Sequence, residues 1–354
     1  MPPRKRARQT ALEDAPEPAP KSPLPLDANT KGVFDLPDEI WLEILSHFSS
    51  VRIPTLRLND APLLSSSTLE REHALRALSQ TCRAFRAFLL PELWVRFEVC
   101  ALHNQLEDIA EALEKRSNGL RQSPYHANYV RIVSVALTRC KAATALDAFV
   151  RCLKVLPNLH TLQILRAHSQ MTTHLKNAFG QHKIPQVRTI VLPDYAHNVL
   201  RACPEVRVVM CNCEEGSKLI GAIAKECKKV QVLRGFYPNV NMMKNVVCTY
   251  PPYLFTPTYP NLSCFIPQKI IEMLSPLKHL RAIEICVVSQ ALSNKESGRE
   301  YALEIIKCLT AAKKILLNKT NGKNENEKKQ IWLRVRHHES RHGKATVKEV
   351  PLGL

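Results

Sequence analysis

The sequence predicts an α/β fold, in which an N-terminal helical module precedes an irregular solenoid of alternating strands and helices with a parallel sheet. Two observations support this prediction. Apolar side chains recur at helical spacing between residues 34 and 98. From about residue 129, the pattern apolar-x-x-apolar-x-apolar returns with a mean spacing of 25 residues, and amphipathic helical stretches separate its copies. The 354 residues suffice for roughly two domains.

Composition argues against several classes of protein. Only 10 glycines occur, which leaves little material for a phosphate-binding loop or a turn-rich β sandwich. No run of 18 apolar residues exists, so we expect no membrane span. The basic start of the sequence lacks the apolar stretch of a secretory signal, so we expect the protein in the nucleus, the cytoplasm or both. Its 12 cysteines should then be reduced, mostly as small buried side chains.

The net charge of +18 is unevenly distributed along the chain. Residues 32–100 carry 7 basic and 9 acidic side chains, whereas residues 101–354 carry 37 basic and 19 acidic ones. A basic surface attracts acidic proteins, nucleic acid and anionic lipid alike, so charge alone selects no partner.

Residues 1–33 are proline-rich and poor in large apolar side chains, which predicts a disordered leader. A basic cluster lies near its start and consists of Arg4, Lys5, Arg6 and Arg8. Such a cluster is compatible with a nuclear import signal and, equally, with a solvated basic tail.

The first helix of the module is expected to begin just after Phe34. Pro37 stands where a first helical turn tolerates proline, because that turn has no use for its missing amide hydrogen. Asp38 and Glu39 favour the positive end of the helix dipole. An apolar stripe at helical spacing then follows: Ile40, Trp41, Ile44, Leu45 and Phe48.

A second helical stretch is predicted from about Arg71 to Glu98. We expect Pro91 to divide it into two helices. Residues 49–69, which separate it from the first helix, are rich in serine and proline and predict a loop. The buried side of the second stretch comprises Leu75, Leu78, Cys82, Phe85, Leu89, Leu93 and Trp94.

Two segments of this module carry a family resemblance. One is Leu36-Pro37-Asp38-Glu39-Ile40 with Glu43-Ile44-Leu45; the other runs from Ala77 to Arg86 and ends in Pro91-Glu92-Leu93-Trp94. They resemble the F-box family, a three-helix module that binds the small Skp-type adaptor of the SCF ubiquitin ligase. The resemblance implies an adaptor-binding set composed of Leu36, Pro37, Ile40, Ile44, Leu45, Cys82, Phe85, Leu89 and Trp94.

The chain departs from the F-box pattern at two places. Phe85 stands where the family most often has tryptophan, and the loop over residues 49–69 is longer than usual. The longer loop costs little, because each doubling of loop length adds only about 0.6 kcal/mol of closure entropy. The alternative interpretation is an ordinary all-α module, since Leu-Pro before an acidic first turn is a common helix start.

The strand pattern begins each copy with an apolar anchor residue. Several anchors follow a proline that ends the preceding helix. Helices are expected between copies, near residues 145–156, 172–179, 217–229 and 269–277, and after the last copy near 301–317. The anchors are Val130, Leu159, Val187, Val206 and Leu280, with partial copies at Val230 and Leu262.

This arrangement resembles the divergent leucine-rich repeats that often follow an F-box, particularly in fungal families. The asparagine or cysteine of that family, eight residues after the anchor, is absent. The buried turn must therefore satisfy its backbone groups in another way, which favours an irregular solenoid over a regular horseshoe. An open parallel α/β sheet is the alternative, although its Gly-rich turn and cofactor signature are missing.

The residue that follows the anchor is arginine in four of seven copies: Arg131, Arg188, Arg207 and Arg281. Stacked in a solenoid, these residues would form a discontinuous basic ladder along one rim of the sheet. We take this ladder as a candidate partner-binding rim for an acidic or phosphorylated segment, because arginine binds carboxylate and phosphate bidentately. The alternative is a solvated edge that prevents pairing with other strands. The other three ladder residues are His160, Gln231 and Ser263.

The domain boundaries follow from these patterns. Residues 1–33 form the leader, 34–98 the helical module, 99–128 a connecting helix and linker, and 129–317 the solenoid. Residues 318–354 then contain a lysine-rich loop and a closing strand near 331–335. Alternate strand residues should line the concave face of the solenoid: Thr161, Gln163, Thr189, Val191, Val208, Met210, Arg234, Ala282 and Glu284.

The sequence offers no catalytic constellation, so we expect a non-catalytic protein without cofactor or metal. Gly-x-Ser-x-Gly, His-Glu-x-x-His and Gly-Lys-Ser/Thr motifs are all missing. One cysteine group has a spacing that matches no common zinc site: Cys203, Cys211, Cys213 and Cys227. Three histidines cluster near the end of the chain, but neighbours on a strand face opposite sides: His337, His338 and His342.

The expected function is substrate recognition in an SCF-type ubiquitin ligase. The helical module would bind the Skp-type adaptor, and through it the cullin scaffold, while the solenoid would bind an unknown protein target. Two alternatives stay open: a basic nucleic-acid-binding protein and a scaffold that acts without a ligase. The low aromatic content of 6% and the lack of a base-stacking module favour a protein partner over nucleic acid.

Overall fold

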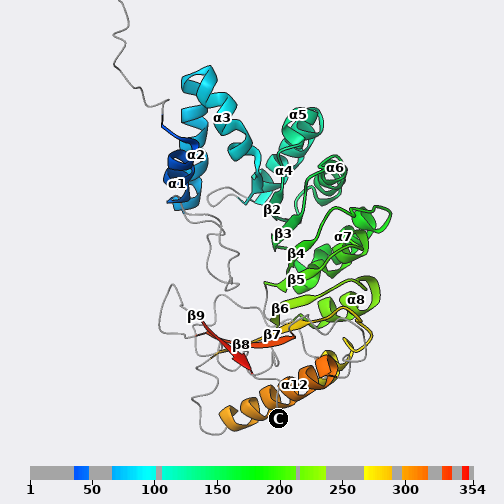
Figure 1. Cartoon of the computed structure of the whole chain (residues 1–354). Coiled ribbons are helices and arrows are strands. Elements are labelled where there is room, and N and C mark those ends of the chain that lie inside the picture. Colours follow the sequence, from blue (N-terminus) through cyan, green and yellow to red (C-terminus); the bar gives the residue numbers. More distant parts are fainter. Residues whose placement is uncertain are drawn as a thin grey trace, which may run out of the picture.

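The computed structural model describes residues 36–47, 66–100, 106–212, 216–236, 267–288, 297–317, 329–336 and 345–350. They form an α/β structure around one nine-stranded sheet. The strands lie side by side in chain order from β1 to β9, and every neighbouring pair is parallel except β8 and β9. In Figure 1 the strands stack in a curved row, and the helices between them line one side of it.

The strands are short and regular in length. Their bounds are β1 (Arg96–Val99), β2 (Ile132–Ala136), β3 (Thr161–Arg166), β4 (Thr189–Leu192), β5 (Val208–Cys211), β6 (Val232–Phe236), β7 (Ala282–Val288), β8 (Gln330–Arg336) and β9 (Ala345–Val350). The apolar positions of the repeat pattern are the buried ones: Val130, Val133 and Val135 of the first predicted copy are all 0% exposed. One continuous apolar core unites such strand residues with residues of the helices.

The helices precede the sheet or connect its strands. Three precede it: α1 (Asp38–Ser46), α2 (Ser66–Thr81) and α3 (Arg83–Trp94). None of the described helices is both long and apolar enough to cross a membrane. The connecting elements are α4 (Leu106–Arg121), α5 (Pro124–Ala127), α6 (Ala142–Lys154), the 3-10 helix η2 (Ser169–Met171), α7 (Thr172–Gly180), the 3-10 helix η3 (Asp194–Ala202), α8 (Ser217–Glu226), α10 (Pro267–Glu272) and α12 (Ser297–Leu317).

The predicted division of the second helical stretch at Pro91 is wrong. The break lies at Cys82, whose backbone is extended and whose Sγ accepts a hydrogen bond from the amide of Phe85 at 3.4 Å. Pro91 lies inside α3, at the ninth of its 12 positions. Pro91 cannot donate to the carbonyl of Ala87, but only three residues of α3 follow it, so the interruption is confined to the last turn of the helix.

The sheet begins one strand earlier than the sequence pattern predicted. Residues 96–99 form β1, which pairs with β2 in parallel, so Arg96 lies opposite Ile132. Trp94, Phe97 and Val99 repeat the apolar-x-x-apolar-x-apolar pattern. Its first residue, Trp94, also continues the helical spacing of α3, so the sequence alone does not distinguish this copy from the helix.

The interval between the anchors at 187 and 206 is the shortest among β2 to β6 and holds η3 instead of an α-helix. A 3-10 helix rises about 2.0 Å per residue against 1.5 Å for an α-helix. Nine residues of η3 therefore span about 18 Å, close to the length of the longer α6. The greater rise per residue of η3 therefore lets this short interval span about the same distance as the longer intervals that contain α-helices.

Polar side chains satisfy the buried turn that follows the strands. Asn212 donates from Nδ2 to the carbonyls of Ile164 and Leu165, at 3.0 and 3.1 Å. Asp194 accepts a hydrogen bond from the amide of Leu219 at 2.9 Å, at the start of α8. Asn212 lies six residues after the anchor Val206. Leucine-rich repeats place their asparagine or cysteine eight residues after the anchor, so that spacing does not identify Asn212 in the sequence.

Replacing Asn212 by alanine should lower the free energy of unfolding by about 1–3 kcal/mol, because two buried carbonyl groups would lose their donor. Urea denaturation followed by circular dichroism measures the change. Asn158→Ala is the matched control, since exposed Asn158 also donates to a backbone carbonyl, that of Asn128. If both variants lost the same free energy of unfolding, burial of the Asn212 hydrogen bonds would not increase their contribution to stability.

Candidate docking surfaces

Helix α1 divides its apolar residues between two faces. Trp41 and Leu45 are buried, at 9% and 4% exposure. Ile40 and Ile44 are 46% and 41% exposed, and Leu36, just before the helix, is 38% exposed. Residues four apart share one face of a helix, so Ile40 and Ile44 form an apolar strip on the outside. The single stripe predicted from the sequence is thus two surfaces with different surroundings.

The inner face of α1 belongs to a small core that is separate from the core of the sheet. The rings of Trp41 and Phe85 meet edge to face, with centroids 5.0 Å apart. Cys82 is half-buried at the start of α3, and Pro37 is exposed, with its carbonyl accepting from the amide of Ile40 at 3.0 Å. The buried members of this core are Trp41, Leu45, Leu75, Phe85 and Leu89.

Trp94, the last residue of the predicted adaptor-binding set, lies against the repeats. Its ring stacks on the imidazole of His126 in α5, with centroids 4.6 Å apart. It also packs against the core of the sheet. Trp94 therefore joins the N-terminal helices to the first strands, a position that its place in the sequence pattern did not indicate.

A cavity of about 550 Å³ lies where α2, α4 and β1 meet. Glu98 lines it, and burial raises the pKa of its carboxyl group above the usual value. Nearby guanidinium groups have protein partners: Arg71 binds Glu92, and Arg116 donates to the carbonyl of Glu98. Among the described residues, the lining offers charge but no hydroxyl, thiol or imidazole group.

The four predicted ladder arginines share one register in the sheet. Each ladder residue donates its backbone N–H to the carbonyl of the ladder residue before it, at distances between 2.8 and 3.0 Å. The series passes directly from Gln231 to Arg281, and Ser263 lies outside the described residues. The complete series is Val95, Arg131, His160, Arg188, Arg207, Gln231, Arg281 and Gln330.

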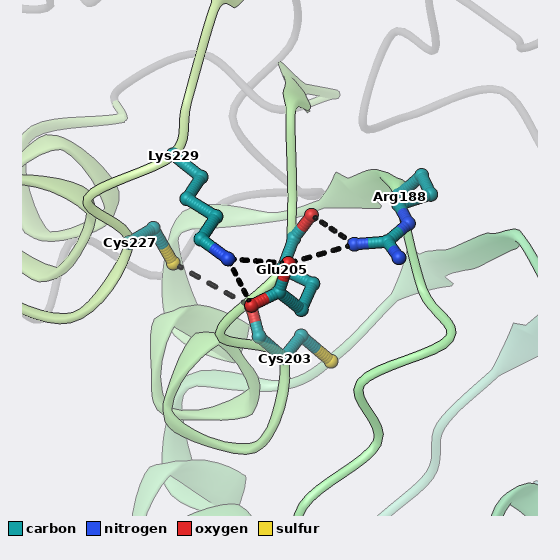
Figure 2. Close-up of polar contacts among 5 residues, drawn as sticks. All are labelled: Arg188, Cys203, Glu205, Cys227 and Lys229. Carbon is teal, nitrogen blue, oxygen red and sulfur yellow. Dashed lines mark hydrogen bonds and ion pairs between the residues drawn. The ribbon is translucent and has the colours of Figure 1, made fainter. Parts of the chain in front are cut away.

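The ladder arginines differ in their surroundings. Arg131 and Arg207 are exposed, whereas Arg188 and Arg281 are half-buried. Arg188 is neutralised by Glu205, with Nη1 and Oε2 2.9 Å apart. Figure 2 shows that Glu205 lies between Arg188 and Lys229, whose Nζ is 2.6 Å from Oε1.

Glu205 thus accepts hydrogen bonds from two neighbouring repeats. Those bonds, from Lys229 first and Arg188 second, hold the pKa of the Glu205 carboxyl below its usual value. Glu205 directly precedes the anchor Val206, and Lys229 directly precedes the next anchor, Val230. The sequence alone therefore does not show that the two side chains meet. Within the predicted discontinuous basic ladder, the charge of Arg188 is therefore not free for a partner.

Most of the predicted concave-face positions are buried. Gln163 accepts a hydrogen bond from the hydroxyl of Ser134, on the neighbouring strand, at 3.0 Å. Glu284 is 3% exposed and pairs with Arg334 of β8, with Nε and Oε1 3.0 Å apart. The guanidinium of Arg234 lies over the ring of Trp332. The buried positions are Thr161, Gln163, Val191, Ala282 and Glu284, while Thr189, Val208, Met210 and Arg234 are half-buried.

The cysteine group considered for zinc is part of the core where it is described. Cys203, Cys211 and Cys227 are buried, and Cys213 lies outside the described residues, as do His337, His338 and His342. Burial raises the pKa of Cys227 to about 12, and its Sγ lies 3.9 Å from the carbonyl oxygen of Cys203. In the described part of the chain, no group of three metal-binding side chains comes together.

Comparison with known proteins adds no relative: no family model matches the chain, and no curated protein matches it significantly.

Proposed function

We propose that the chain is a non-catalytic substrate receptor of an SCF-type ubiquitin ligase. In this proposal α1, α2 and α3 form an F-box that binds a Skp-type adaptor. The strands and helices that follow form an irregular leucine-rich-repeat-like solenoid that binds a protein target. Catalysis resides in other subunits, and the receptor raises the effective concentration of the target near them.

The observation that carries the proposal is the outer face of α1. Leu36, Ile40 and Ile44 are each about four-tenths exposed, next to a core that includes Trp41 and Leu45 of the same helix. Covering each of these side chains would contribute roughly 1 kcal/mol, about half the value for a fully exposed aliphatic group. Large aliphatic residues grouped on one exposed face are typical of a surface that a partner covers.

The test is co-purification with a Skp-type adaptor. We expect the wild-type chain to retain the adaptor on an affinity column and the Ile40→Asp/Ile44→Asp variant to lose it, with affinity reduced by roughly a hundredfold or more, because two carboxylates would be buried without partners. Replacing both Leu36 and Pro37 should also abolish binding. Calorimetric titration of purified components measures the affinities.

The matched control lies on α12. Leu303 and Ile306 are also exposed aliphatic residues on one helix, at 56% and 57% exposure. Leu303→Asp/Ile306→Asp should leave adaptor binding unchanged. Retained binding in the α1 variant, while its circular dichroism spectrum matches that of the wild type, would refute the proposal.

A further inference from the structure

Positive charge is concentrated at the N-terminal ends of three neighbouring strands, β5, β6 and β7. Among the equivalent turn residues before β2, β3 and β4, the cations are Arg131 and Arg188. The turns before β5, β6 and β7 carry five lysines and arginines against one acid, Glu205. We name this surface the basic edge; it comprises Arg207, Lys228, Lys229, Lys278, His279 and Arg281.

The basic edge is accessible, and much of its charge is uncompensated. All six of its side chains except half-buried Arg281 are exposed. Lys229 is paired with Glu205. Within the described part of the chain, no carboxylate lies within 4 Å of the cationic groups of Arg207, Lys278 or Arg281. Like charges gathered on one surface repel one another in the free protein, and an anionic partner would relieve that repulsion.

The hydrogen-bonded backbone fixes the spacing of these cations. Arg207 and Arg281 are two steps apart in the ladder, with Gln231 between them. Neighbouring strands lie about 4.8 Å apart, so two steps span about 10 Å. One turn of a polyproline II helix has three residues and rises about 9 Å, and residues three apart lie on the same side of it. A peptide that crosses the strand ends with acids at every third residue would match the two arginines.

We propose that the basic edge binds an acidic segment of a protein, with carboxylates or phosphates about three residues apart. This inference rests on the proposed function, in which the repeats select the target for ubiquitination. Each arginine would bind one anionic group bidentately, and Lys278 would add a third contact. Arg188 contributes little, because Glu205 already occupies its guanidinium.

Single-stranded nucleic acid fits the basic edge less well than an acidic peptide. Proteins that bind single strands combine a basic track with exposed aromatic side chains on which bases stack. The turns that carry the basic edge, residues 203–207, 227–231 and 277–281, contain no phenylalanine, tyrosine or tryptophan. Tyr125, which is 60% exposed, lies on α5 near the opposite end of the sheet.

The experiment uses the full chain and a fluorescein-labelled peptide of about 12 residues, with aspartate at every third position among glycine and serine. We expect fluorescence anisotropy to show binding that weakens with added salt. The same peptide with asparagine for aspartate should not bind. The Arg207→Glu/Lys278→Glu/Arg281→Glu variant should bind roughly 30-fold more weakly or worse, because three attractive contacts become repulsive.

The charge-matched control replaces three exposed lysines in the middle of α4, α7 and α12: Lys115→Glu/Lys176→Glu/Lys307→Glu. It should bind the aspartate peptide like the wild type. An equal loss in this control, or no binding by the wild type, would overturn the inference. Tighter binding of an oligothymidine of the same charge, lost in the basic-edge variant, would overturn it in favour of nucleic acid.

The two proposals can fail separately. The basic-edge variant should still bind the Skp-type adaptor, and the Ile40→Asp/Ile44→Asp variant should still bind the aspartate peptide. Loss of adaptor binding therefore reports on α1 alone, and loss of peptide binding reports on the basic edge alone.

Discussion

Gly235→Ala should lower the free energy of unfolding by about 3 kcal/mol or more. Gly235 has a φ of +78°, a left-handed conformation that costs an alanine about 1–2 kcal/mol. A Cβ atom at this position would lie 2.1 Å from the carbonyl oxygen of Cys211, so β5 and β6 would have to separate. Separation would weaken hydrogen bonds worth about 1 kcal/mol each. Urea denaturation of the purified variant measures the loss.

A second glycine supplies the control. Gly221 lies in α8, where a Cβ would meet only the end of the Met273 side chain, at 3.6 Å. Gly221→Ala should be neutral or stabilising by about 0.5–1 kcal/mol, because alanine favours the helix. If Gly235→Ala were as stable as Gly221→Ala, the close approach of β5 and β6 at Gly235 would be wrong.

Leu89→Ala should destabilise the N-terminal helices by about 2–5 kcal/mol. Leu89 is 0% exposed in a core that has five buried members among the described residues, so its neighbours have little means to fill the space that it leaves. This core is distinct from that of the sheet, so we expect the helices to melt before the sheet does. The fluorescence of Trp41, beside Phe85, and circular dichroism together follow the two transitions.

The reciprocal variant tests whether the two cores are independent. Leu162, also 0% exposed, belongs to the core of the sheet. Leu162→Ala should lower the second transition and leave the first unchanged, whereas Leu89→Ala should do the opposite and reduce adaptor binding. A single transition that both variants lower equally would show that the helices and the sheet unfold together.

The period of the sequence pattern predicted most of the strands because a parallel strand buried against helices must repeat its apolar positions. Val133, Leu162 and Ile190 are such positions, and all are 0% exposed. The copy that begins at Trp94 is harder to recognise, because Trp94 also fits the helical spacing of α3. The sequence pattern does not predict β9 either, because this strand pairs antiparallel with β8 and is not a copy of the repeated pattern.

Interactions between repeats could not be predicted in the same way. The arginine register follows from the anchors, so the ladder was predictable. The pairing of Arg188, Glu205 and Lys229 joins three repeats, and its geometry depends on how far each intervening helix advances the chain. Asn212 likewise reaches back past β4 to the end of β3, a contact between residues 48 apart in the chain.

The chain-order arrangement of the strands bears on how the protein is made. Each strand pairs only with the strand before and after it in the sequence. Such a topology has low contact order, so a nascent chain can add one strand at a time as it leaves the ribosome. The widest step separates β6, which ends at Phe236, from β7, which begins at Ala282. Until β7 is synthesised, the edge of β6 stays unpaired for longer than any other strand edge of the sheet, and during that time it can pair with another chain.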